Sequence, residues 1–266
     1  MSMVILITGT SSGFGLAIRR HLVSKGYKVY GSSRMADGSD PYTLAIDVRR
    51  AESVQSAVNK IIEREGHIDV LINNAGMGIG GAAELAMPEE VDLQMGTNFI
   101  GCTNTCRAVL PYMRSQHKGM IINISSIAGR FAIPYQGLYS ASKFAIEGYS
   151  QALALETKQF GIKIVCVNPG DFNTGFTRAR KISQQTIDSD DYKQSFARVL
   201  RNVEKDELGG GSPELLARKI GKIVTKRHPR FHYIVAKDPI QIFAVYLSMI
   251  LPQNFFHWII RLFYSV

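Results

Sequence analysis

Two segments of the sequence place a tyrosine four residues before a lysine, a spacing that can support acid–base chemistry. They are YSASK, from Tyr139 to Lys143, and YIVAK, from Tyr233 to Lys237. A free tyrosine has a pKa near 10, and lowering it enough for a base at neutral pH requires roughly 3–4 kcal/mol. One ammonium about 4 Å away supplies a similar amount at an effective dielectric constant of about 20.

The expected secondary structure separates the two segments. Residues 135–156 follow a helical pattern, in which residues four apart share one face, so Lys143 should lie beside Tyr139. Residues 231–237 alternate like a strand, and four strand residues span about 13 Å. Lys237 is then too far from Tyr233 to change its pKa. We therefore interpret the second match as a coincidence and Tyr139 as the candidate general acid/base.

Short β-branched runs alternate with helix-period segments along the whole chain. Several runs are apolar on both faces, as strands covered by helices on either side must be. This alternation predicts an α/β fold with one doubly wound parallel sheet, a Rossmann fold, in a single domain over residues 1–266. The expected strands are 3–9, 27–33, 42–48, 68–76, 119–126, 162–170 and 231–237, and the expected helices are 14–25, 52–65, 89–116, 136–159 and 213–227.

Two segments depart from the alternation. Residues 171–210 are polar and charged, and we expect a mobile substrate lid there. Residues 239–266 are apolar but interrupted too often for a membrane span, and they predict two short helices broken at Pro252. We expect this C-terminal extension to pack on the domain or on a dimer partner. Lining a lipophilic pocket or resting on a membrane surface are the alternatives.

Composition limits the possible partners and the cellular compartment. The net charge of +9 suggests an anionic partner such as a phosphorylated cofactor. Lys and Arg are scattered and no nucleic-acid motif accompanies them, so a basic solvated surface is favoured over a nucleic-acid face. No zinc-ligand spacing appears, and no metal is expected. Three cysteines in apolar patterns and the absence of a signal sequence predict reduced thiols in a cytoplasmic protein.

A glycine-rich turn, TGTSSGFG at 8–15, joins the first expected strand to the first expected helix. Gly9 allows a sharp turn off the strand, Gly13 a close approach of the backbone to a pyrophosphate, and Gly15 tight packing of the helix. The helix N-terminus supplies unpaired N–H groups and partial positive charge to phosphates. Placed between a strand and a helix, this turn predicts a dinucleotide site.

This glycine spacing, NNAG at 73–76 and YSASK together resemble the short-chain dehydrogenase/reductase family, in its compact NAD(P)-dependent branch. The resemblance spans essentially the whole chain. It implies hydride transfer between nicotinamide and a carbonyl, with Tyr139 as general acid/base and Lys143 lowering its pKa and binding the ribose. It also implies Ser126 as the group that orients the substrate, with Ser125 as the alternative. Asn98 would hold a water that relays protons to Lys143.

The resemblance also implies the cofactor contacts. Ser33 stands where NAD-binding sites usually carry an acidic residue, and Arg34 after it can pair with a 2′-phosphate, although Asp37 is close enough for a different loop geometry. We therefore predict NADP(H), with NAD(H) possible. The predicted contacts are Gly9, Thr10, Ser11, Ser12, Gly13, Phe14, Gly15, Ser33, Arg34, Asp47, Val48, Asn74, Ala75, Gly76, Tyr139, Lys143, Pro169, Gly170 and Thr174.

The sequence thus predicts an NADP(H)-dependent oxidoreductase that interconverts a secondary alcohol and a ketone or aldehyde. The stretch 129–148 and the apolar C-terminus resemble hydroxysteroid- and retinol-dehydrogenase-like members of the family, which suggests a lipophilic small-molecule substrate. Family members commonly form homodimers or homotetramers. The alternative is a protein that senses NADP(H) on the same fold and regulates a partner without turnover.

Overall fold

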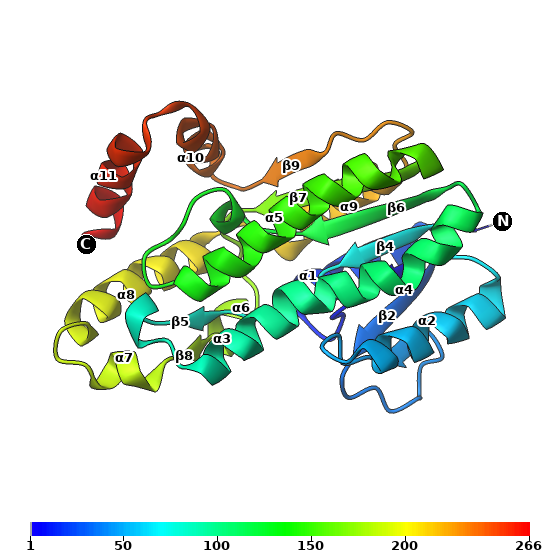
Figure 1. Ribbon diagram of the computed structural model, residues 1–266, viewed down its shortest axis with the longest axis horizontal. Helices are drawn as coiled ribbons and strands as arrows, with labels where there is room; N and C mark the ends of the chain where they lie inside the picture. Colours follow the sequence, from blue (N-terminus) through cyan, green and yellow to red (C-terminus); the bar gives the residue numbers. More distant parts are fainter. Residues whose placement is uncertain (1) are drawn as a thin grey trace.

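A seven-stranded, wholly parallel sheet forms the centre of the molecule (Figure 1). The computed structural model describes residues 2–266. The strand order is β3-β2-β1-β4-β6-β7-β9. This topology confirms the predicted doubly wound fold, with the order reversing between β1 and β4. The strands are β1 (Val4–Ile7), β2 (Lys28–Ser33), β3 (Thr43–Ala45), β4 (Val70–Asn73), β6 (Gly119–Ile124), β7 (Ile162–Pro169) and β9 (His232–Val235).

Helices cover both faces of the sheet because its strands are apolar on both sides. Val4 and Leu6 of β1 pack with helices α2 (Ala51–Glu65), α4 (Gly101–Ser115) and α5 (Gly137–Thr157). Ile5 and Ile7 point to the other face, against α1 (Gly13–Ser24) and α9 (Pro213–Val224). Successive strand residues alternate between two cores, each dominated by Val, Ile and Leu.

Two expected elements differ from the structure. The third strand is shorter than 42–48, since only Thr43–Ala45 pair with β2. The expected helix 89–116 is divided into α3 (Pro88–Met95), a π-helical turn (Gly96–Ile100) and α4. Such π-turns occur frequently at functional sites, and this one contains Asn98. The remaining short helical turns are Ala83–Leu85, Ile127–Gly129 and Lys158–Phe160.

The segment expected to form a lid is folded beside the carboxyl ends of the strands. It contains α6 (Phe176–Ala179), β8 (Lys181–Ile182), α7 (Gln184–Asp188) and α8 (Lys193–Gly209). Strand β8 pairs in parallel with β5 (Ile79–Gly80), in a second sheet of two strands. Arg180 forms an ion pair with Glu207 of α8, and the Thr177 hydroxyl donates to the same carboxylate at 2.6 Å. The expected mobility of residues 171–210 stays a prediction.

The C-terminal extension forms two helices, as predicted. Helix α10 (Pro239–Ile250) ends just before Pro252, and α11 (Gln253–Tyr264) begins just after it. On the inner side, Val245 and Phe256 are buried with Phe131, and the rings of Phe131 and Phe256 meet edge to face with centroids 5.4 Å apart. Within residues 2–266, none of the helices combines the length and the apolar character needed to span a bilayer.

A buried amide network sets the position of β6 and α5. The Asn73 Nδ2 donates to Asn123 Oδ1 across β4 and β6 at 2.8 Å, and the Thr105 hydroxyl of α4 donates to Asn73 Oδ1 at 2.5 Å. The Asn123 Nδ2 donates to the Ser150 hydroxyl of α5 at 2.8 Å. Because fully satisfied buried networks specify one arrangement, the network fixes β6 and α5 relative to each other.

The Asn123→Ala substitution should destabilise the fold by about 2–3 kcal/mol, because it leaves the buried Asn73 amide with only the weakly accepting Cys106 sulfur at 3.3 Å. The measurement is the free energy of unfolding in urea. The matched control is Gln55→Ala, which removes an exposed side-chain hydrogen bond to Asn59 on α2 and should cost less than about 0.5 kcal/mol. Equal losses in the two variants would show that the network does not stabilise the fold.

Candidate active site

Tyr139 and Lys143 lie one turn apart on α5, with their side chains adjacent as predicted. The Lys143 Nζ is 5.6 Å from the centre of the Tyr139 ring. The same ammonium donates a 2.8 Å hydrogen bond to the backbone carbonyl of Ile124, the last residue of β6. Lys143 is only 5% exposed. This bond anchors the helix to the carboxyl end of the strand that carries the catalytic serine candidate.

The pKa of the phenol is shifted against the expectation. Burial raises the pKa of Tyr139 to about 12; the Ser126 hydroxyl acts to lower it, and Glu207 acts to raise it. Burial also lowers the pKa of Lys143 to about 8. The expected lowering of the Tyr139 pKa by Lys143 is absent from this structure, because the ammonium donates to Ile124 and burial of the phenol dominates. The phenol of Tyr139 is therefore protonated at pH 7.

Ser125 and Ser126 both line the cavity that contains Tyr139, but only the Ser126 hydroxyl acts on the phenol. Ser126 lies at the start of the Ile127–Gly129 turn, where its Oγ accepts a 3.1 Å bond from the Ala128 N–H, and its hydroxyl influences the pKa of Tyr139. The Ser125 Oγ faces Gly129, where an added Cβ would meet it at 2.7 Å. Between the two serines left open by the sequence, the geometry favours Ser126.

Asn98 is a buried amide whose polar atoms all have protein partners. Its Nδ2 donates to the Met77 carbonyl at 3.0 Å and to the Ser142 hydroxyl at 2.9 Å. Its Oδ1 accepts from the Met77 N–H at 2.9 Å. These bonds position the loop after β4 against α5, so the structure shows a positioning role. The predicted water relay to Lys143 stays a prediction.

The glycine turn has the conformation that a dinucleotide site needs. Gly9 and Gly13 adopt φ values of +70° and +55°, in the left-handed region that favours glycine. A Cβ on Gly15 would lie 2.1 Å from the Gly9 carbonyl oxygen and 2.6 Å from Asn74 Nδ2. Gly15 thus packs α1 against the turn and Asn74, rather than against the sheet. Thr10 is buried and bonds to the Ser32 carbonyl at 3.2 Å, so it supports the turn from behind.

Two adjoining cavities lie along the carboxyl ends of the strands. One, of about 350 Å³, is lined by the turn and the ends of β2 and the segment after β3. The other, of about 210 Å³, is lined by Tyr139, Lys143 and Ser126, and we call it the catalytic cavity. Ser12, Asn74 and Gly76 line both, so a dinucleotide can span them. Predicted contacts in the first are Gly9, Ser11, Ser12, Ser33, Arg34, Asp47, Val48, Asn74, Ala75 and Gly76. Those in the second are Ser12, Phe14, Asn74, Gly76, Tyr139, Lys143, Pro169, Gly170 and Thr174.

The residues that line the two cavities differ in part from the predicted cofactor contacts. Thr10, Gly13 and Gly15 were predicted contacts, but they shape the turn without lining either cavity. Other lining residues were not predicted, because they lie in separate segments of the chain that only the fold brings together. In the larger cavity, these are Ser32, Ile46, Arg49, Met77, Gly78, Leu93, Thr97, Phe176, Ala179 and Lys181.

Basic side chains outnumber acidic ones along the larger cavity. Arg34, Arg49 and Lys181 line it, against Asp47 alone. Asp47 pairs with Arg49 at 2.9 Å, and the Arg49 guanidinium holds the pKa of Asp47 below its usual range. Asp37, the alternative to Arg34, accepts bonds from the N–H and the hydroxyl of Ser39 within its own turn.

An acidic wall, formed by Asp171, Asp206 and Glu207, lines the catalytic cavity. Burial, together with the nearby Glu207 and Asp206 carboxylates, raises the pKa of Asp171 to about 6. Gln241 of α10 holds Asp171 twice, since its Oε1 accepts from the Asp171 N–H at 2.9 Å and its Nε2 donates to the carboxylate. Apolar side chains from Ile133, Val203 and Tyr264 line the same cavity.

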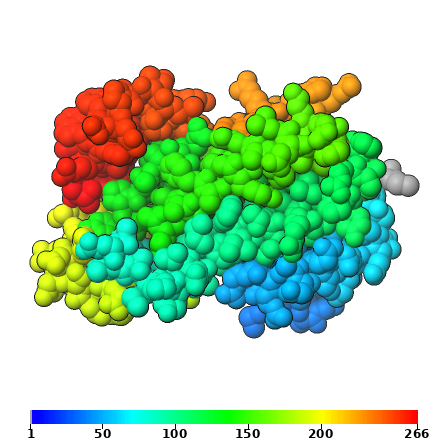
Figure 2. All heavy atoms as spheres, in the orientation of Figure 1, coloured from blue at the N-terminus to red at the C-terminus, as the bar shows by residue number. Residues whose placement is uncertain are grey.

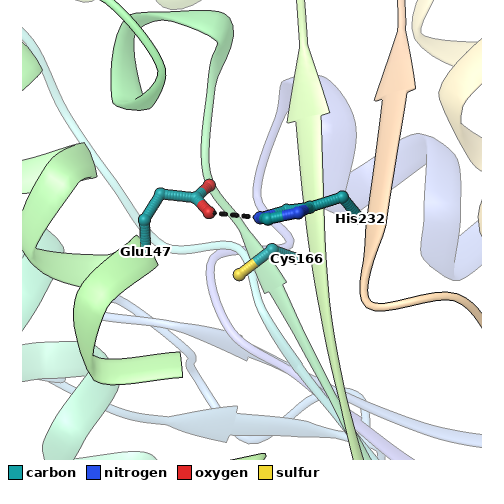
Figure 3. A group of neighbouring side chains, drawn as sticks. All are labelled: Glu147, Cys166 and His232. Atoms are coloured by element: carbon teal, nitrogen blue, oxygen red, sulfur yellow. Dashed lines mark hydrogen bonds and ion pairs between the residues drawn. The ribbon is translucent and has the colours of Figure 1, made fainter. Parts of the chain in front are cut away.

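Behind Ser126, a hydrogen-bonded cluster around the buried Glu147 carboxylate braces the end of β7. His232 Nε2 lies 2.7 Å from Glu147 Oε2, beside Cys166 (Figure 3). The Asn168 Nδ2 donates to Glu147 Oε1 at 2.6 Å and to the Ser126 carbonyl at 3.0 Å. Burial acts to raise the pKa of Glu147, but hydrogen bonds from His232 and other neighbours outweigh it and hold the pKa low. Burial raises the pKa of the Cys166 thiol, so the thiol stays protonated and the cluster positions the Ser126 backbone.

Several known proteins are similar to this chain in sequence or in fold. The chain is 52% identical to a 3-ketodihydrosphingosine reductase of Bacteroides thetaiotaomicron, over 99% of this chain and 98% of that protein. A structure of ElxO with NADP bound matches with a TM-score of 0.71 and 27% identity, covering 88% of this chain and 96% of ElxO. A Brucella melitensis 3-ketoacyl-(acyl-carrier-protein) reductase complexed with NADH matches with a TM-score of 0.72 and 25% identity, over 88% and 96% of the two chains.

These similarities agree with the geometry of the two cavities. The relatives include nicotinamide-dependent enzymes and a ketone reductase, and the glycine turn and Tyr139 occupy the positions that such chemistry requires. The family model for short chain dehydrogenases matches residues 3–185. This protein therefore belongs to the short-chain dehydrogenase/reductase family.

Proposed function

We propose that this protein is an NADP(H)-dependent reductase that converts the ketone of a long-chain amino ketone to a secondary alcohol. The observation that carries the proposal is that one cavity brings together the Tyr139 phenol, three carboxyl groups and an apolar wall. The phenol suits proton donation to a carbonyl oxygen, the carboxylates suit a cationic amine, and the apolar wall suits an alkyl chain.

The 52% identical relative is named for a substrate with these three features. A 3-ketodihydrosphingosine has a long alkyl chain, a ketone, and on the neighbouring carbon an amine that is protonated at neutral pH. Asp171 and Glu207 both act on the pKa of Tyr139 through their charge, so they lie close to the reacting position. A carboxylate at that distance provides the counter-charge for an ammonium beside the carbonyl.

Proton donation by Tyr139 fits the direction of ketone reduction. NADPH, when bound, supplies the hydride to the carbonyl carbon. The neutral phenol, with its pKa of about 12, then donates a proton to the oxygen as negative charge develops. Ser126 lines the same cavity, and its hydroxyl orients that oxygen by hydrogen bonding. Alcohol oxidation needs the phenolate instead, which burial of Tyr139 disfavours.

The preference for NADP(H) is supported by the charges of the larger cavity. Arg34, directly after Ser33, and Lys181 both line it, whereas Arg49 is paired with Asp47. A 2′-phosphate gains charge-assisted hydrogen bonds there. NAD(H) is the alternative, since relatives of both kinds of cofactor specificity share the fold.

The Tyr139→Phe substitution should lower kcat for ketone reduction by about 10²–10⁴-fold, because it removes the proton donor. The measurement is NADPH oxidation with a panel of long-chain amino ketones, alongside the Kd for NADPH, which should change little. The matched control is Tyr233→Phe, which removes only a buried hydrogen bond to the Arg230 N–H and should retain turnover. NADPH binding by the native protein without turnover of any ketone would favour the sensor instead.

The Arg34→Asp substitution should lower the ratio of kcat/KM for NADPH to that for NADH by about 10–100-fold, because one charged hydrogen-bonding group is replaced by a repelling one. Initial rates with each cofactor give this ratio. Arg20→Asp, an exposed position on α1, makes the same charge change and should leave the ratio unaltered. An unaltered ratio in Arg34→Asp would contradict the NADP(H) assignment.

The Asp171→Asn substitution should raise KM for an amino ketone about tenfold or more, since a charged hydrogen bond is lost. KM for an uncharged ketone of equal chain length should not rise. Because burial and the Glu207 and Asp206 carboxylates raise the pKa of Asp171 to about 6, against the opposing effect of Arg180, native KM for the amine should also increase as pH falls through 6. The Asn variant should lack that increase, and an equal KM rise for both ketones would contradict amine recognition.

A further inference from the structure

The two C-terminal helices expose an unusual number of large apolar side chains. We define the C-terminal apolar face as Ile240, Phe243, Tyr246, Met249, Ile250, Phe255, Trp258, Leu262 and Phe263. These side chains are 50–79% exposed. Figure 2 shows the two helices at one end of the molecule, with their outer surface open to solvent. Apolar patches of this kind mark interaction surfaces, because a soluble surface gains nothing from them.

The exposure is a consequence of helices that are apolar on two opposite sides. On α10, Ile240, Phe243 and Ile250 recur at helical spacing on the outer side, while Val245 faces inwards and is 1% exposed. On α11, Trp258 and Leu262 face outwards and Phe256 faces inwards. The inner side packs on Ile127 and Phe131. Nothing within residues 2–266 covers the outer side.

The charges around this face have one predominant sign. Residues 239–266 contain no Asp or Glu side chain, whereas Arg261 lies on α11. Arg130 reaches the face from the neighbouring turn, with its Nη2 3.3 Å from the Met249 sulfur and its Nη1 3.8 Å from the buried Glu147 carboxylate. Lys237 precedes α10, although Asp238, whose carboxylate caps Ile240, lies beside it. An apolar centre with basic groups at its rim, in a chain of net charge +9, complements an anionic lipid surface.

The inner side of the same helices forms part of the catalytic cavity. Tyr264 of α11 lines it, and Gln241 of α10 holds the cavity residue Asp171 through both its backbone and its carboxylate. One pair of helices therefore separates the cavity from the C-terminal apolar face.

From the exposure, the charge and this placement, we infer that the face rests on an anionic lipid bilayer, with the catalytic cavity against the membrane. The inference goes beyond the proposed function and does not depend on the substrate.

The test is flotation of the full-length protein with vesicles of equal parts phosphatidylcholine and phosphatidylglycerol. The native protein should float with the vesicles. Phe243→Glu/Trp258→Glu places two charges on the face and should reduce the vesicle-bound fraction at least about tenfold. The matched control is Val23→Glu/Leu155→Glu, which adds the same charges at exposed apolar positions on α1 and α5 and should float like the native protein. Thermal unfolding midpoints establish that both variants fold.

Several outcomes would overturn the inference. Native protein that stays in solution would do so, and so would equal flotation of the face variant or equal loss in the control. A second copy of the chain could cover the face instead of a membrane. Light scattering after size exclusion, without vesicles, distinguishes the two. A native oligomer that dissociates in the face variant, with no flotation of the native protein, would assign the face to a second copy of the chain. Because no readout requires turnover, failure of the proposed function would leave this result unaffected.

Discussion

The parallel register of β4, β6 and β7 is the constraint on which the site depends. Asn73 pairs with Asn123, and Ile124 pairs with Val167 in the next strand. Since all three strands end at the same edge, the residues that follow them converge there without contact in sequence. The loop after Asn73 approaches the cofactor cavity, and Ser126 and Pro169 follow at the substrate side. The amide network between Asn73 and Asn123 is thus stabilising and positioning at once.

The electrostatics of the catalytic cavity follow from what the lid and the C-terminal helices add to this edge. A typical parallel sheet edge offers N–H groups and positive helix ends to anions, which suits the cofactor. On the substrate side, Asp171, Asp206 and Glu207 reverse the sign, with Arg180 paired to Glu207. Burial, together with the Glu207 and Asp171 carboxylates, raises the pKa of Tyr139 and keeps its phenol protonated. In the proposed function, the same charges favour a cationic substrate and a proton-donating tyrosine.

The parts of the site that could be predicted from sequence are those determined by local geometry. The Tyr139 and Lys143 pair needed only a helical period, and the positive φ values of Gly9 and Gly13 needed only glycine in a turn between strand and helix. The acidic wall could not be predicted, because Asp171 and Glu207 are brought together by the folding of α8 over the sheet edge. The π-turn at Asn98 also escaped prediction, and Asn98 makes tertiary hydrogen bonds to Met77 that no local pattern encodes. The raised pKa of Tyr139 depends on burial, which no spacing encodes.

The C-terminal helices connect substrate selection with the surface of the molecule. Gln241 fixes the orientation of Asp171, and Tyr264 closes part of the cavity wall. A displacement of α10 would therefore release the carboxylate of the acidic wall that carries the raised pKa. Buried polar pairs tolerate little movement. A surface that displaces α10 or α11 would therefore also displace the acidic wall of the catalytic cavity. The C-terminal apolar face and the acidic wall of the catalytic cavity thus lie on opposite sides of a layer only one helix thick.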